Sequence, residues 1–180
     1  LGIRFLTSDG REILCGGGLM QLDHIDVSRM DPRLGEATLL FAADVTNPLF
    51  GQNGAAVVYG PQEGAGSDEV LQLDRGLQKL RDVLLQQTGV DVQGIPGAGA
   101  AGGLGVPFAA FAGAQIGKGL DFVLDVVGFD AALRGADLVI SGEGRTDTQS
   151  TMGKVLSGVG SRAKRAGVPV VAISGSLGRG

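Results

Sequence analysis

The chain has 180 residues, of which 43% are hydrophobic and 33 are glycine, well above the usual glycine share of about 7%, so it reads as a folded, loop-rich protein. A net charge of −4 without a basic cluster, and an aromatic set of seven Phe and one Tyr, speak against nucleic acid or an anionic membrane as partners. The single Cys excludes an internal disulfide framework, and the single His excludes a His-rich zinc site. Together with the lack of a signal-peptide pattern, these counts favour a cytoplasmic protein.

The first third of the chain holds short apolar segments separated by turns. Residues 3–6 predict a short strand, and residues 19–25 a short helix after a run of three glycines. The continuous apolar run 37–43 is typical of a buried strand. Residues 44–54 are polar and rich in turn formers, and the apolar stretch 55–59 is too short to assign to helix or strand.

Residues 67–87 form the clearest predicted helix. Its apolar residues recur three and four positions apart, as one buried helix face requires; they are Val70, Leu73, Leu77, Leu80 and Leu84. Ser67 is a suitable N-cap, and Gly89 is placed to end the helix.

Residues 94–117 carry no charge over 24 positions, which raises the possibility of a membrane span. Eight Gly, two Pro and seven Ala make this stretch too weakly hydrophobic for one. A glycine-rich loop followed by a buried helix over 104–112, with Pro107 in its first turn, fits better.

The last third predicts a strand–loop–helix–strand unit. A short buried strand over 137–141 is followed by a loop over 142–147 and a helix over 154–166. The apolar run 168–173 is the next strand. Two apolar strands joined by a helix indicate a parallel pair with a right-handed crossover.

The segment 97–102 matches the dinucleotide pattern G-x-G-x-x-G, but its context is wrong. Pro96 abuts the first glycine, and the preceding residues make a poor buried strand. Two interpretations remain open: a glycine-rich turn needed for close packing, or backbone N–H groups that hold an anionic ligand. No Walker A motif is present.

Two polar segments follow predicted strands, where open α/β sheets place their ligands. Asp44 and Asn47 follow the first, and their side chains could hold Mg²⁺, accept a hydroxyl proton, or only shape the turn at Pro48. The second segment, 142–147, combines two carboxylates and one guanidinium between glycines. This mixture suits phosphate and metal chemistry, with a solvated loop holding a local ion pair as the alternative.

Five segments together resemble the type I glycerate kinase family. They occur in the family's order and spacing, and the similarity covers essentially the whole chain. They are DVTNPL (44–49), VYGPQEGA (58–65), PGAGAAGGLG (96–105), DLVISGEGR (137–145) and GVPVVAI (167–173).

The resemblance implies ATP-dependent phosphorylation of D-glycerate with Mg²⁺, with 2-phosphoglycerate favoured as the product. It also implies an α/β fold of two domains with the active site in the cleft between them. Residues 1–115 would form the second, inserted α/β domain, and residues 116–180 part of a Rossmann-like domain with a partial parallel sheet. D-glycerate is then the small-molecule partner, and an oligomer is compatible with the family.

Site residues follow from the same resemblance and from the residues themselves. Asp44, Glu143 and Asp147 are the candidate catalytic carboxylates, and Asp44 and Asp147 are also the candidate metal ligands. The candidate substrate- and phosphate-binding residues are Asn47, Arg145, Lys154, Gly97, Gly99, Gly102 and Gly103.

The chain also departs from the family pattern. Glu63 stands where Lys is usual, and Thr146 where an aliphatic residue is common. Family members are longer at both ends, so the resemblance implies a central fragment that is inactive as a kinase by itself. A non-catalytic α/β fragment that binds phosphate or a small acid is the alternative function, and another phosphate-handling α/β enzyme, such as a dinucleotide-dependent one, is a further alternative.

Overall fold

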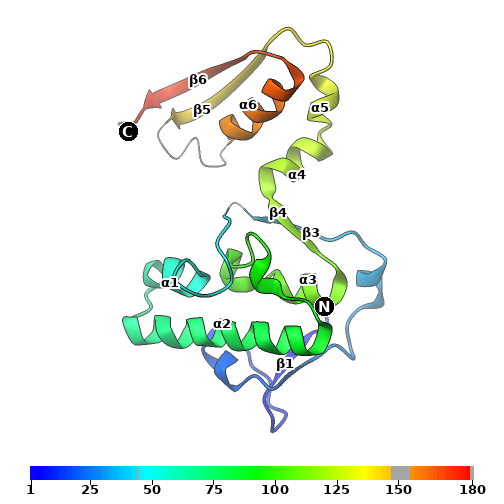
Figure 1. Ribbon diagram of the computed structural model, residues 1–180, viewed down its shortest axis with the longest axis vertical. Helices are drawn as coiled ribbons and strands as arrows, with labels where there is room; N and C mark the ends of the chain where they lie inside the picture. The colour runs from blue at the N-terminus through cyan, green and yellow to red at the C-terminus, as the bar shows by residue number, and fades with distance from the viewer. Residues whose placement is uncertain (44, 147–154, 179–180) are drawn as a thin grey trace. The chain divides into compact units, whose positions relative to one another are not determined.

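The computed structural model describes residues 1–180 except 44, 147–154 and 179–180 (Figure 1). It is a mixed α/β structure that divides into two compact units, residues 1–117 and residues 118–180. Each unit is described by itself below, as the first and the second unit.

The first unit is built around one long helix. Helix α2 packs against η1, α1, α3 and β2, and its buried residues include Leu77, Leu80 and Leu84, which confirms the predicted helix face. The elements of this unit in chain order are β1 (Arg4–Leu6), η1 (Gly16–Gln21), β2 (His24–Asp26), η2 (Pro32–Gly35), β3 (Leu40–Ala43), α1 (Ala55–Tyr59), η3 (Gly60–Glu63), α2 (Ser67–Thr88), η4 (Val92–Gly94), η5 (Ala100–Gly103), α3 (Val106–Ala112) and β4 (Gln115–Lys118).

The ends of α2 show one confirmed and one corrected prediction. Gly89 ends the helix in the left-handed region at φ +75°, as expected. The N-cap is Gly66 rather than Ser67, because the Glu69 carboxylate reaches back and accepts the Gly66 N–H at 2.8 Å. The acidic residue of the first turn thus satisfies the N–H of the N-cap residue itself, which is the Glu half of a capping box.

The helix predicted over 19–25 is wrong. Residues 16–21 form a 3-10 helix and residues 24–26 form strand β2, which pairs antiparallel with β1. Ile25 accounts for the change: its side chain is buried, and the Gln87 side chain exchanges two hydrogen bonds with its backbone, at 2.8 and 3.0 Å. Tertiary pairing therefore overrides a local pattern too short to decide between helix and strand.

The middle apolar segments are partly as predicted. Strand β3 begins at Leu40 rather than residue 37, and only its last residue, Ala43, is buried. The unassigned stretch 55–59 is helix α1, and the helix predicted over 104–112 is α3, with Pro107 in its first turn. Only Val106 and Pro107 of α3 are buried. Among the described residues, no helix has the length and apolar character needed to span a bilayer.

The second unit contains α4 (Gly119–Val126), α5 (Phe129–Ala132), β5 (Val139–Thr146), α6 (Val155–Ala166) and β6 (Val170–Leu177). Strands β5 and β6 pair in parallel, from Val139 opposite Val170 onward, which confirms the predicted parallel pair. A small core forms where Leu133, Ala163 and Val168 pack together with Val139 and Val170.

Two predictions for this unit are wrong. A loop was expected over 142–147, but residues 142–146 belong to strand β5, which continues to Thr146 and pairs with β6. The strands are also not buried on both faces: Ile140 is 65% exposed and Ile173 62% exposed. Side chains alternate along a strand, so these residues lie on the face opposite the one that Val139 and Val170 turn to the core.

Unequal burial predicts unequal protection from hydrogen exchange. The amides of β6 should exchange faster than those of α2 between Val70 and Leu84, because β6 lies in a two-stranded pair with one exposed face. Native-state exchange followed by mass spectrometry would measure this. Equal protection of the two segments would contradict it.

The turn after α2 predicts a specific acid sensitivity. Asp91 accepts two hydrogen bonds from the Arg81 guanidinium, at 2.6 and 2.9 Å, and these lower its pKa to about 2, with help from the Gln93 N–H. The folded pKa lies below the unfolded value, so the ion pair stabilises the fold above about pH 4 and loses that effect as the pH falls toward 2.

Substitution Arg81→Gln should return the pKa of Asp91 toward its ordinary value of 3.8. Titration of the Asp91 carboxyl carbon by NMR would measure the shift. Lys79→Gln, on the same helix with the same loss of charge, is the control and should leave the Asp91 pKa where it was. An Asp91 pKa that Arg81→Gln does not change would show that the ion pair is not its cause.

Candidate functional site

Two predicted site segments of the first unit lie in direct backbone contact. The Gly99 N–H donates to the Asn47 carbonyl at 3.0 Å, and a β-carbon on Gly99 would lie 2.3 Å from the Pro48 carbonyl oxygen. A residue with any side chain cannot occupy position 99 without moving one of the two backbones. The fold therefore brings together the segments 44–49 and 96–105, as an active site built from both motifs would require.

The other glycines of the loop are needed for different reasons. A β-carbon on Gly97 would lie 3.0 Å from the Val45 carbonyl oxygen, and one on Gly103 would lie 2.5 Å from Leu49. Gly102 has free space around it, but its φ of +68° favours glycine. Close packing explains Gly99, both close packing and a positive φ (+85° and +88°) explain Gly97 and Gly103, and backbone conformation explains Gly102.

Asn47 has its side chain fixed from two sides. The Tyr59 hydroxyl donates to Asn47 Oδ1 at 2.6 Å, and Asn47 Nδ2 donates to the Asn53 carbonyl at 2.9 Å. These bonds use one lone pair and one N–H of the amide and leave one of each for a ligand. Tyr59 was not predicted as part of the site; the available signal was that the chain's single tyrosine lies in the motif 58–65.

A pocket of about 640 Å³ opens beside this contact. Residues of all three motifs of the first unit line it, together with side chains of α2. Its lining includes Val45, Tyr59, Gln62, Glu63, Leu77 and Gly102. A largely apolar pocket with a few polar groups at its rim has the usual character of a small-molecule site.

In the second unit the structure places part of the predicted site. Glu143 is half-buried on β5 opposite Ser174, and Arg145 lies two positions further along, opposite Ser176. Asp44, Asp147 and Lys154 lie outside the described residues. Their predicted roles, like that of the Arg145 side chain, therefore remain predictions.

The second unit also holds a buried charge that sequence reasoning missed. Arg162 of α6 is only 7% exposed and lies within 2.5 Å of Asp125, 3.3 Å of Asp121 and 3.4 Å of Asp130. Hydrogen bonding to Asp125, above all, raises the pKa of Arg162. The signal was present: an arginine between the apolar positions 159 and 163, and two aspartates four residues apart on α4.

Comparison with known proteins supports one family over the whole chain. The model of the glycerate kinase family matches residues 1–180. The chain is 47% identical over 181 residues to a glycerate kinase of Halalkalibacterium halodurans, and 44% identical over 178 residues to glycerate 2-kinase of Escherichia coli. A crystal structure assigned to a glycerate kinase 2 of Salmonella typhimurium LT2 matches 98% of the chain at 44% identity, with a TM-score of 0.87.

These matches cover nearly all of this chain but only part of each relative. The matched region is 48% of the H. halodurans protein and 47% of the E. coli protein. It is likewise 47% of the Salmonella chain. The chain therefore spans about half the length of the relatives it matches.

The contact at Gly99 predicts a sharp contrast between two glycines. Gly99→Ala should destabilise the fold by about 2–3 kcal/mol, the cost of overpacking, because the new methyl group would meet the Pro48 carbonyl. Gly94→Ala is the matched control, since a β-carbon there meets nothing within 4 Å. Urea denaturation of both variants would measure the difference, and equal stabilities would rule out the proposed close approach.

Proposed function

The chain belongs to the glycerate kinase family, and from this premise we propose that it contributes to an enzyme that phosphorylates D-glycerate with ATP. The observation that carries the proposal is the backbone contact between Gly99 and Asn47, which brings two of the family-like motifs together beside a pocket. The name of the E. coli relative, glycerate 2-kinase, supports 2-phosphoglycerate as the product.

The domain assignment is part of the same proposal. The second unit would belong to a Rossmann-like domain, beginning near residue 116, because β5, α6 and β6 form the strand–helix–strand unit of such folds. The first unit would be the second α/β domain, up to about residue 115. A cytoplasmic location is also proposed, from the composition of the sequence.

Phosphoryl transfer depends on positioning and charge neutralisation more than on covalent help from the protein. Asp44 or Asp147 would accept the proton of the glycerate hydroxyl, with Glu143 as a further carboxylate of the site. Arg145 and Lys154 would neutralise the carboxylate of glycerate or the phosphates. The free N–H of the Asn47 amide, whose orientation Tyr59 and Asn53 fix, would donate to the substrate.

Mg²⁺ fits this set of residues by chemistry. Magnesium prefers oxygen ligands and is usually held by one or two carboxylates together with substrate phosphates, so Asp44 and Asp147 would hold it. When bound, it would neutralise charge on the transferred phosphoryl group.

A chimera provides the test. These 180 residues would replace the matching segment of E. coli glycerate 2-kinase, and a coupled assay would measure phosphorylation that depends on both ATP and D-glycerate. We expect activity in the chimera. In it, Asp147→Asn should lower turnover by about two orders of magnitude or more, the range for a positioned acid–base group.

The control for this substitution is Asp137→Asn, an identical chemical change at an exposed residue before β5. It should leave turnover within about twofold, as surface substitutions usually do. Thermal unfolding of each chimera would confirm that it is folded. A folded chimera that binds glycerate or phosphate without turnover would instead favour the non-catalytic binding function.

A further inference from the structure

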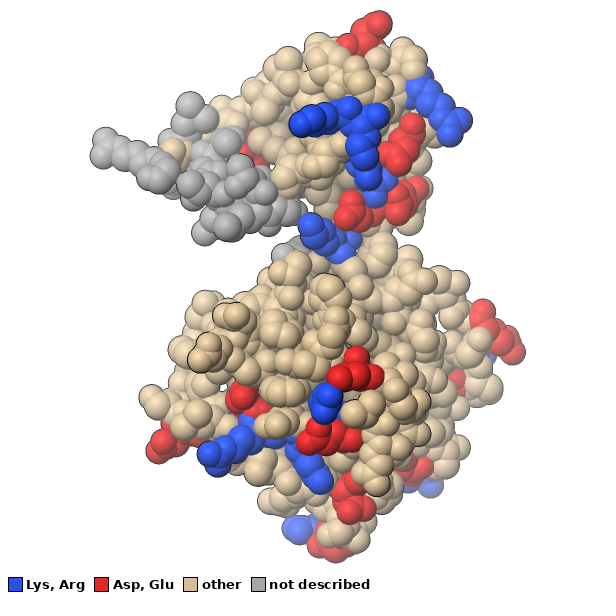
Figure 2. Space-filling model, in the orientation of Figure 1, with Lys and Arg blue, Asp and Glu red and all other residues tan. Residues whose placement is uncertain are grey.

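The two units carry opposite net charges. Residues 1–117 hold seven Lys and Arg against thirteen Asp and Glu, whereas residues 118–180 hold eight against six. The chain is acidic as a whole, so the basic character of the second unit is a local property. In Figure 2 several Lys and Arg side chains of this unit gather on the face in view. A net positive unit attracts anionic ligands.

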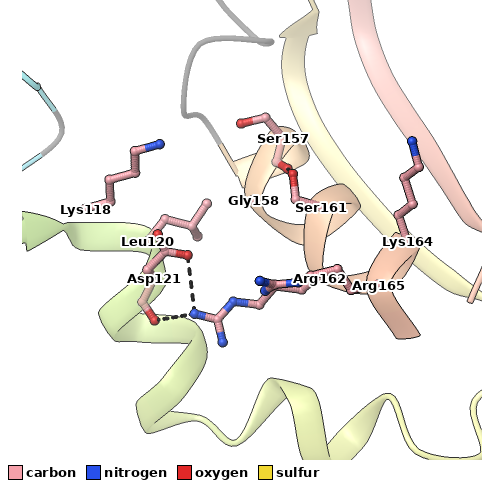
Figure 3. Close-up of a pocket in the computed structure, with 9 residues that line it drawn as sticks. All are labelled: Lys118, Leu120, Asp121, Ser157, Gly158, Ser161, Arg162, Lys164 and Arg165. Atoms are coloured by element: carbon pink, nitrogen blue, oxygen red, sulfur yellow. Dashed lines mark hydrogen bonds and ion pairs between the residues drawn. The ribbon is translucent and has the colours of Figure 1, made fainter. Parts of the chain in front are cut away.

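A pocket of about 700 Å³ lies within the second unit, between the start of α4 and one face of α6. Figure 3 shows Lys118, the last residue of β4 before α4, and Ser157 of α6 pointing toward the same space. Among the residues that the structure describes, four basic side chains and one carboxylate line the pocket. They are Lys118, Arg162, Lys164, Arg165 and Asp121.

The pocket has a rigid base. Gly158 of α6 lies against Leu120 of α4, and a β-carbon there would come within 2.2 Å of the leucine side chain, so a larger residue at 158 would force that side chain to move. Beside this contact, Arg162 donates to the carbonyl and the carboxylate of Asp121, at 3.0 and 3.3 Å. One contact sets the spacing of the two helices, and the other fixes their orientation.

Arg162 also neutralises the carboxylate that faces the pocket. Figure 3 shows Asp121 directed at the Arg162 guanidinium, and the remaining bonds of that guanidinium go to Asp125 and Asp130. The other three cations have no ion pair among the residues that the structure describes; these are Lys118, Lys164 and Arg165. The charge left over in the pocket is therefore positive.

We propose that this pocket between α4 and α6 binds a phosphate group. Lys118 and Arg165 would donate charge-assisted hydrogen bonds to its oxygens. The Ser161 hydroxyl donates to the Ser157 carbonyl at 2.7 Å and so is committed within the helix. The choice of phosphate rests on the proposed function, whose reaction involves two phosphate-bearing ligands: the nucleotide and the phosphorylated product.

The test measures phosphate binding apart from catalysis. Isothermal titration calorimetry of the chimera would follow sodium tripolyphosphate, ATP and 2-phosphoglycerate. The double variant Lys118→Gln/Arg165→Gln should bind tripolyphosphate about tenfold more weakly, or worse, for each cation lost. The same loss for ATP would identify the nucleotide as the source of the phosphate, and the same loss for 2-phosphoglycerate would identify the product.

Two controls make the result decisive. Lys79→Gln, an exposed lysine of α2, should leave tripolyphosphate affinity unchanged, and the charge-conserving Lys118→Arg/Arg165→Lys should largely retain it. Unchanged affinity in the folded double glutamine variant would overturn the proposal. A chimera that lacks kinase activity but loses tripolyphosphate affinity in this variant would refute the proposed function and leave the pocket standing.

Discussion

The organisation of the first unit depends on one close approach of two backbones. Gly99 donates its N–H to the Asn47 carbonyl and lies so near Pro48 that a single methyl group would not fit. A backbone hydrogen bond fixes the positions of both partners. This contact therefore sets the position of the Asn47 backbone, and with it the directions that the Asn47 side chain can take. Tyr59 and Asn53 then hold the amide itself. Tyr59 also lines the pocket of this unit, together with Val45 and Gly102.

The arrangement of helices in the second unit depends on a buried cation, the guanidinium of Arg162. An arginine removed from water is tolerated only when carboxylates and hydrogen bonds replace its hydration. Arg162 obtains both from α4 and α5, through Asp121, Asp125 and Asp130. The three carboxylates join α6 to α4 and α5, so the network specifies how α6 sits against the two other helices.

The long periodic helix α2 could be predicted from the sequence, whereas the conformation of the short segment 19–25 could not. Helix α2 has five apolar residues at helical spacing, and three of them, Leu77, Leu80 and Leu84, are buried in the folded unit. Residues 19–25 offered only about two turns of pattern, and pairing with β1 decided the conformation of residues 24–26. For the site, the motifs identified which segments take part. The contacts of Tyr59 with Asn47 and of Arg162 with Asp125 join residues 12 and 37 positions apart, and a local pattern does not show which residues will meet over such separations.

The glycine-rich segment shows why a motif needs its physical reason. In a dinucleotide fold the three glycines of G-x-G-x-x-G serve a tight turn, a close approach to pyrophosphate and helix packing. Here Gly97 and Gly99 approach a neighbouring segment of the same chain, and Gly102 adopts a positive φ. The protein's own packing and backbone conformation therefore explain all three. The same spacing of glycines arises whenever a backbone must lie against another surface, and only the identity of that surface separates a ligand site from a packing contact.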